Sequence, residues 1–426
     1  MERIRQTAVL AALAKWVKGL IRKPGIEERD FRDRRQNCGG RSEREREPSE
    51  FQNRKVNKSP GFMVSRLAFG FMIPILGEVT PGTTQRHLIK LPGAALANDE
   101  PRPVISVAGA KPGPVLFVNA GVHGGEYPAV EAVIRLGKTL DPKKISGTVI
   151  LMPVLNLPAF RTRTPFVCPI DNVNPNRVFP GDPRGSYSEQ MTHACINEFV
   201  VHADAYVDLH GGDIPEALVP FVICRSEAGL ADSKARDVAA RSKQIAMAFG
   251  LPYVLTVSKP VQPSKGHRAG AGGLSSYAAA ADKGTPAILA EAGGAGQMQE
   301  EAVALLVNGV VNVMRHLGMI EDAKFESHIA NSETNSKPKP KKTACSAVAT
   351  TVLTKFEWLY TKSTGVWYPK VAQGDAVREG EQIGTIGDLF GDTLENINSP
   401  VNGVVLFLTI NPSVLENGLL MGIGVE

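Results

Sequence analysis

From residue 63 onward, short apolar runs alternate with longer segments in which apolar residues recur at helical spacing. Residues 83 to 91 alternate between apolar and polar, and 103 to 109 and 114 to 121 are short apolar runs bounded by proline and glycine. Both patterns are typical of β-strands. We expect further strands at 148 to 156, 205 to 212, 218 to 223, 252 to 257 and 286 to 294.

Helical periodicity lies between several of these strands. Residues 128 to 140 open with proline and repeat apolar residues at helical spacing, and we expect further helices around 188 to 202, 228 to 249 and 299 to 317. Strands that alternate with helices predict an α/β fold with a mixed, mostly parallel sheet flanked by helices. Such sheets bind ligands where the strands end in loops.

The length of 426 residues exceeds what one hydrophobic core usually organises, so we expect two domains and a tail. No apolar run approaches the roughly 20 residues that cross a bilayer, so no membrane span is predicted. The five cysteines are scattered and never form a CxxC pair. This pattern indicates reduced thiols in an interior, cytoplasmic compartment and argues against a cysteine-based zinc site.

The net charge of +5 comes from the start of the chain. Residues 1 to 60 contain 16 of the 48 Lys and Arg but only 9 of the 43 Asp and Glu, so the remainder is close to neutral and indicates no nucleic-acid partner. Residues 5 to 23 would form a basic amphipathic helix suited to a membrane surface or transit peptide, but the charge-dense stretch that follows would not fold. We expect 1 to 62 to be a disordered charged extension, with Met63 a plausible true start and a targeting segment as the alternative.

Three residues of metal-ligand type stand at the ends of predicted strands. His123 and Glu126 follow one apolar run in "NAGVHGGE", and His210 ends another in "YVDLH". Two histidines and a glutamate with an open fourth position are the catalytic form of zinc binding. The alternative for the first pair is a turn with two solvated side chains. Gly124 and Gly125 would let the backbone bend so that both ligands face one ion.

Asp208 stands two residues before His210 and so lies on the same face of the predicted strand. It is either an acceptor for the N–H of the histidine or a buried structural aspartate.

Four motifs in order, "NAGVHGGE", "DNVNPNRVFPGDPRGS", "DLHGG" and "PAILAEAGG", resemble the succinylglutamate desuccinylase/aspartoacylase family, a branch of the zinc carboxypeptidase-like hydrolases. The resemblance covers residues 75 to 426. It implies a carboxypeptidase-like fold and one zinc ion per chain, held by His123, Glu126 and His210. It also implies that Glu291 acts on the zinc-bound water.

The same resemblance implies that Asn176 and Arg177 hold a substrate carboxylate and that an upstream arginine polarises the scissile carbonyl. Arg161 and Arg163 both fit that description, and we choose Arg163. Pro175 stands where the family more often has leucine, which stiffens the loop and leaves Asn176 and Arg177 in register.

These residue types suit amide hydrolysis. A metal ion lowers the pKa of a water molecule and stabilises the developing oxyanion, and Glu291 would serve as general base and then acid, although a structural strand-end glutamate is the alternative. Arg177 offers a planar fork that matches a carboxylate, and Asn176 adds a donor. The polar, proline-rich segment 161 to 185 is long enough to form a substrate-binding lip.

The end of the chain has a different character. Residues 331 to 344 are polar and rich in proline and lysine, which predicts a linker between the hydrolase domain at 63 to 330 and a β domain at 345 to 426. The β domain resembles the barrel-sandwich-like domain of the same family, similar to biotinyl or lipoyl carriers. The segment 392 to 400 lacks the lysine of a carrier, so we expect a structural domain that shields the active site or aids homo-oligomerisation.

The sequence therefore predicts a zinc-dependent hydrolase that cleaves the amide of a small N-acyl amino acid or related carboxylate. The alternatives are a zinc carboxypeptidase that acts on short peptides and a non-catalytic protein that binds a metal or a carboxylate. The presence of Glu291 favours an enzyme, because binding alone needs no general base.

Overall fold

The computed structural model describes residues 71–258, 273–320 and 350–426. The predicted N-terminal extension and the predicted linker lie outside the described residues, so both remain predictions. None of the described helices is long and apolar enough to cross a membrane.

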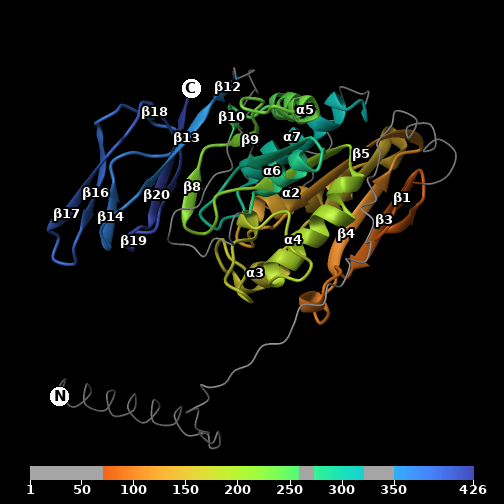
Figure 1. Cartoon of the computed structure of the whole chain (residues 1–426), viewed down its shortest axis with the longest axis horizontal. Helices are drawn as coiled ribbons and strands as arrows, with labels where there is room; N and C mark the ends of the chain where they lie inside the picture. Colours follow the sequence, from red (N-terminus) through yellow and green to blue (C-terminus); the bar gives the residue numbers. More distant parts are fainter. Residues whose placement is uncertain (1–70, 259–272, 321–349) are drawn as a thin grey trace, which may run out of the picture. The chain divides into compact units, whose positions relative to one another are not determined.

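A nine-stranded sheet forms the centre of the α/β part, with the strand order β12-β10-β9-β11-β7-β5-β6-β4-β3 (Figure 1). Five of its eight strand pairs are parallel, which confirms the predicted mixed, mostly parallel sheet. The strands are β3 (Thr83–Ile89), β4 (Arg102–Ala108), β5 (Lys111–Ala120), β6 (Ser146–Met152), β7 (Ala205–His210), β9 (Phe221–Arg225), β10 (Tyr253–Val257), β11 (Ala287–Glu291) and β12 (Thr351–Leu353), and a small hairpin of β1 (Phe71–Ile73) and β2 (Gly77–Val79) precedes them.

Helices cover both faces of this sheet, because its central strands are apolar on both sides. On β5, Leu116 and Val118 pack into the core under one set of helices, whereas Phe117 between them packs into the core under the other set. Strands buried on both faces are expected in a parallel sheet. The first set is α2 (Tyr127–Thr139), α5 (Ser233–Phe249) and α7 (Glu300–His316), and the second is α4 (Tyr187–Glu198) and α6 (Ser276–Asp282), with the short α3 (Leu157–Thr162) after β6.

The single strand predicted at 218 to 223 is wrong, since the structure divides it. β8 (Glu216–Leu218) pairs antiparallel with β18 of the C-terminal domain, whereas β9 belongs to the nine-stranded sheet. Pro220 lies between the two strands and has no N–H to donate to a ladder, so the chain leaves one sheet before it enters the next. β8 therefore joins the C-terminal strands to the α/β part.

The C-terminal strands form two antiparallel sheets with one shared apolar core that includes Trp367, Ile386 and Met421. This arrangement agrees with the predicted all-β domain, although β12 lies at the edge of the large sheet. One sheet has the order β13-β20-β18-β15, and the other has the order β17-β16-β14-β19. Their bounds are β13 (Lys355–Tyr360), β14 (Gly365–Pro369), β15 (Ala376–Val377), β16 (Gln382–Gly387), β17 (Thr393–Asn398), β18 (Gly403–Thr409), β19 (Ser413–Val414) and β20 (Leu419–Val425).

Candidate active site

Three adjacent parallel strands, β5, β7 and β11, end at the same edge of the large sheet. Glu291 is the last residue of β11 and lies directly beside His210, the last residue of β7. His123 and Glu126 follow β5, and Glu126 is the N-cap of α2. The sheet therefore brings together four of the predicted site residues from distant parts of the sequence.

The Glu126 carboxylate lies between the two imidazole rings. Its Oε1 lies 2.8 Å from His123 Nδ1, and its Oε2 lies 2.8 Å from His210 Nδ1. All three side chains are buried. Burial alone would raise the pKa of Glu126, but the two histidines outweigh this effect and lower it to about 2. The glutamate is thus held as an anion between two nitrogen ligands.

Neighbouring oxygens determine which ring nitrogen faces the carboxylate. Asn174 Oδ1 accepts the Asn176 N–H at 2.8 Å and lies 3.1 Å from His123 Nε2, so this Nε2 must donate. Asp208 Oδ2 lies 3.0 Å from His210 Nε2 and accepts from it in the same way. In both rings Nε2 therefore donates to an outer oxygen and Nδ1 faces Glu126, which is the orientation that an outer acceptor gives to metal-binding histidines.

This geometry fits a bound cation. The ligand atoms of His123, Glu126 and His210 all lie within 4.8 Å of one another. Glu126 Oε2 and His210 Nδ1 are buried and make no hydrogen bond within the described part of the chain, although they face each other. Buried polar atoms without a partner are rare in folded proteins. A cation shared between these atoms would satisfy both, and the His₂Glu set matches catalytic zinc.

The two glycines of the HGGE segment are required by close packing. A Cβ atom on Gly124 would lie 2.2 Å from the carbonyl carbon of Ala159, and one on Gly125 would lie 2.0 Å from Asp213 Oδ1. Neither glycine has a positive φ. Both positions therefore require glycine because a Cβ atom has no room there. This corrects the expectation from the sequence that the glycines allow the backbone to bend.

Glu291 lies beside His210 and lines the same cavity as His123 and Glu126. Its Oε2 is buried and has no hydrogen-bond partner among the residues that the structure describes. Burial raises the pKa of this carboxyl well above its ordinary value, and the nearby His210 opposes the shift. The free oxygen can therefore accept a proton from a group in the cavity.

Asn176 and Arg177 also line the cavity, in the turn Pro175–Arg177. Asn176 Oδ1 accepts the N–H of Ser276 at 2.9 Å, which leaves its Nδ2 as the donor available to a ligand. Arg177 donates to the carbonyl of Asn176 at 2.8 Å, and burial lowers the pKa of its guanidinium. A guanidinium and an amide donor at one wall suit an anionic group.

The structure does not bring either predicted carbonyl-polarising arginine to this cavity. Arg163 is exposed at the C-cap of α3, where its left-handed backbone (φ 57°) turns the chain, and it is not among the lining residues. Arg161 is exposed and pairs with Glu100. After this turn Phe166 reaches the cavity instead, with its ring centre 6.0 Å from that of His123.

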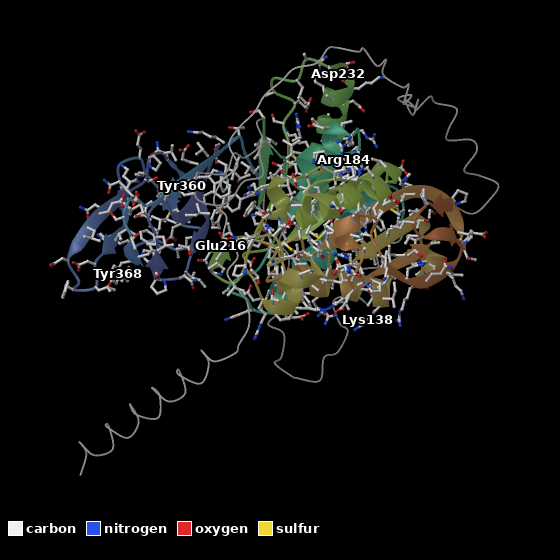
Figure 2. The ribbon with its side chains drawn as sticks, turned by 60° about the horizontal axis from the view of Figure 1, so that its bottom comes forward. Lys138, Arg184, Glu216, Asp232, Tyr360 and Tyr368 are labelled. Carbon is white, nitrogen blue, oxygen red and sulfur yellow. The ribbon has the colours of Figure 1, made fainter. Side chains whose placement is uncertain are left out.

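Glu216 and Tyr360 are among the lining residues that were not predicted from the sequence. Glu216 opens β8, and burial, with the charges of Glu126 and Asp213, raises its pKa to about 8 although Arg177 opposes the shift. Tyr360 comes from β13 of the C-terminal domain, and Figure 2 labels both side chains. The carboxylate six residues after His210 was a readable signal for Glu216. No local pattern could assign Tyr360, since a distant domain supplies it.

The cavity has a volume of about 370 Å³, within the range of small-molecule sites. Two of the ligand-type residues, His123 and Glu126, line this one cavity with Glu291 and Arg177, together with apolar side chains of β9, β10, β13 and β18. It is therefore suited to a small molecule that has both a polar and an apolar part.

Known proteins resemble this chain over most of its length. Residues 112–317 match the succinylglutamate desuccinylase/aspartoacylase catalytic domain. The N-alpha-acetyl-L-2,4-diaminobutyric acid deacetylase of Halomonas elongata is 27% identical over 315 residues, which cover 72% of this chain and 80% of that protein.

Solved structures show the same fold. A succinylglutamate desuccinylase/aspartoacylase from Rhodobacter sphaeroides superimposes with a TM-score of 0.64 at 25% identity, covering 82% of this chain and 98% of that chain. A product-bound ectoine utilization protein from Ruegeria pomeroyi superimposes with a TM-score of 0.65 at 21% identity and the same coverage, a likeness of fold. Residues 112–317 of this chain therefore correspond to the succinylglutamate desuccinylase/aspartoacylase catalytic domain.

Proposed function

We propose that the protein is a zinc-dependent hydrolase that cleaves the amide bond of a small N-acyl amino acid. The observation that supports this most directly is the position of Glu291, a buried carboxylate beside His210 in the cavity that also contains Arg177. A binding protein would have no use for a proton acceptor at that place.

Each residue has a defined part in this proposal. His123, Glu126 and His210 hold the zinc ion, which when bound acts as a Lewis acid and lowers the pKa of a water molecule. Glu291 takes a proton from the attacking water and delivers it to the leaving amine. Arg177 and the Nδ2 of Asn176 bind a substrate carboxylate and so fix the amide against Glu291.

The relatives and the cavity favour an N-acyl amino acid over a peptide. The Halomonas relative is by its name a deacetylase of an N-acetylated diamino acid. Side chains of β13 and β18 line one side of the cavity and leave about 370 Å³, which suits a small molecule. The proposal does not specify which acyl group is removed.

The test compares the full chain with its Glu291→Gln variant. We expect both proteins to hold about one zinc per chain, because the His₂Glu set is unchanged. We expect the parent to release acyl groups from N-acyl amino acids and the variant to do so with a kcat roughly 10²–10⁴-fold lower. Zinc is quantified by elemental analysis and acyl release by chromatography.

Other results would identify the alternatives. Release of C-terminal residues from short peptides, without deacylation, would indicate a carboxypeptidase. Zinc and carboxylate binding without any turnover would indicate a non-catalytic protein. Failure of both proteins to hold metal in the presence of added zinc would refute the metal site.

A further inference from the structure

The sheet continues past the candidate catalytic glutamate as an apolar floor. Glu291 on β11 lies beside Phe221 on β9. Two residues earlier on β11, Leu289 lies beside Ile223 of β9. Ile223 in turn lies beside Leu255 on β10. Side chains two residues apart on a strand, and side chains in register across strands, share one face of a sheet. All five side chains line the cavity, so its floor changes from charged to apolar within two strands of His210.

Aromatic rings of the C-terminal domain lie opposite this floor. Phe356 and Trp358 stand two residues apart on β13, and both line the cavity with Phe407 of β18. The ring centres of Phe356 and Trp358 lie 4.7 Å apart, and those of Trp358 and Phe407 lie 5.5 Å apart. A Cβ atom on Gly422 would lie 2.2 Å from the Phe356 ring and 2.3 Å from the Phe407 ring, so this glycine makes room for the cluster.

A β-bulge directs β18 toward the floor. The register between β18 and β20 shifts between Val405 and Phe407, so the intervening Leu406 has no partner. Leu406 and Phe407 therefore both face the α/β part, where Leu406 packs against Phe221 and Leu255. Bulges are found where a strand must re-aim a side chain near a site.

Charged groups are confined to the other half of the cavity. On β8, Glu216 lies beside Thr409, whereas Leu218 lies beside Phe407. The wall thus changes from polar to apolar in two residues, as the floor does. An apolar group would lose contact with water here without leaving a polar partner unsatisfied, whereas a second carboxylate would be buried among rings.

We propose that this apolar half, the aromatic pocket (Phe221, Ile223, Leu255, Phe356, Trp358 and Phe407), binds the side chain of the amino acid that is released. The preferred substrates are then N-acyl derivatives of amino acids with bulky apolar, above all aromatic, side chains. This inference rests on the proposed function. Glu291 delivers its proton to the leaving amine, so the amine lies at Glu291, and the pocket begins at the adjacent Phe221.

Binding is measured on the zinc-loaded full chain with Glu291→Gln, so that turnover does not interfere. Calorimetry compares N-acetyl-L-phenylalanine, N-acetyl-L-aspartate, N-acetylglycine and N-octanoylglycine. We expect the phenylalanine derivative to bind at least about tenfold more tightly than each of the other three. Equal or tighter binding of the aspartate derivative would overturn the proposal, and tighter binding of N-octanoylglycine would overturn the assignment to the amine side.

Trp358→Ala removes one wall of the pocket, and Tyr368→Ala is the matched control. Tyr368 is a half-exposed aromatic residue of the same domain, and Figure 2 shows it toward the outer end of that domain. We expect Trp358→Ala to lower the affinity for N-acetyl-L-phenylalanine roughly tenfold and to change the affinity for N-acetylglycine by no more than about twofold. Tyr368→Ala should bind like the parent. If Trp358→Ala fails to fold, Phe407→Leu provides the same comparison, and unchanged selectivity in a folded variant contradicts the pocket.

Turnover of the parent separates this inference from the proposed function. Selective binding of the phenylalanine derivative without hydrolysis of any N-acyl amino acid would refute the hydrolase and support the pocket. Efficient hydrolysis with a preference for N-acetyl-L-aspartate would support the hydrolase and refute the pocket.

Discussion

At the scale of single residues, Asp208 orients the His210 ring toward Glu126 in the proposed metal site. Its Oδ2 accepts from His210 Nε2 and from the hydroxyl of Ser276. Asp208→Asn would present either a weaker acceptor or a donor to the ring, so we expect zinc affinity to fall about 10–100-fold. A competing chromogenic chelator measures this affinity. Asp232→Asn is the control, because Asp232 caps α5, and unchanged affinity in Asp208→Asn would contradict the orienting role.

Glu216 gives stability a pH dependence of known sign. The unfolded carboxyl loses its proton near pH 4.5, whereas burial raises the folded pKa to about 8. Between these values the folded state binds the extra proton, so its stability decreases as pH rises. Glu216→Gln removes this titrating carboxyl. As pH rises from about 5 to about 8.5, the free energy of unfolding of the variant, relative to that of the parent, should increase by on the order of 1–3 kcal/mol.

Urea unfolding of zinc-free protein checks this expectation, since a bound cation would add its own charge near Glu126. A difference between parent and Glu216→Gln that stays constant over the same pH range would show that Glu216 titrates normally.

The site was predictable where its residues end strands and not where a loop places them. His123, His210 and Glu291 each stand at or just after an apolar run, so the order of strands in a parallel sheet brings them to one edge. The path after α3 depends on a left-handed turn at Arg163, which no apolar pattern indicates. Tyr360 belongs to a strand whose partner lies far away in the sequence.

At the scale of elements, Arg102 connects β4 to α4. It is fully buried, forms an ion pair with Asp99 at 2.6 Å and donates to the carbonyl of Leu155 at 2.7 Å and the hydroxyl of Tyr187 at 3.0 Å. Arg102→Ala leaves the Leu155 carbonyl without this donor and Asp99 without its cation, although the Tyr187 hydroxyl still donates to Asp99, so we expect a loss of about 3–5 kcal/mol in the free energy of unfolding.

Denaturant unfolding of Arg102→Ala is compared with Arg86→Ala. Arg86 is exposed on the neighbouring β3, and its loss should change stability by no more than about 0.5 kcal/mol. Similar small effects in both variants would mean that the buried network contributes little.

Most elements followed from periodicity alone, because strands such as β5 and helices such as α2 have apolar residues at the spacing that their burial requires. The exception at β8 and β9 has a physical cause. The run from 218 to 223 is apolar throughout because both halves are covered, one by the C-terminal domain and one by the large sheet. Apolarity shows that a segment is covered and does not show by what.

At the scale of the whole folded part, the contact between the α/β part and the C-terminal domain completes the cavity. Thr409 donates to the carbonyl of Pro215, 194 positions earlier in the chain. The Val219 N–H donates to Leu406 at 2.9 Å, and the Ile410 N–H donates to Pro215 at 2.8 Å. Pairing at such separation has no local signature, so the sequence predicted a shielding domain without showing which of its side chains line the cavity.

The last prediction tests this contact with two equally buried aliphatic residues. Leu406 packs between the domains against Phe221 and Leu255, whereas Ile386 packs inside the C-terminal domain alone. Each change to alanine should cost about 2–5 kcal/mol. Because proteins open locally, Leu406→Ala should speed hydrogen exchange most at the Val219 and Ile410 amides, by roughly tenfold or more, whereas Ile386→Ala should speed it most in β14 and β16. Mass spectrometry of the exchanged peptides locates the largest change, and protection of the Val219 and Ile410 amides as in the parent would show that Leu406 does not hold the domains together.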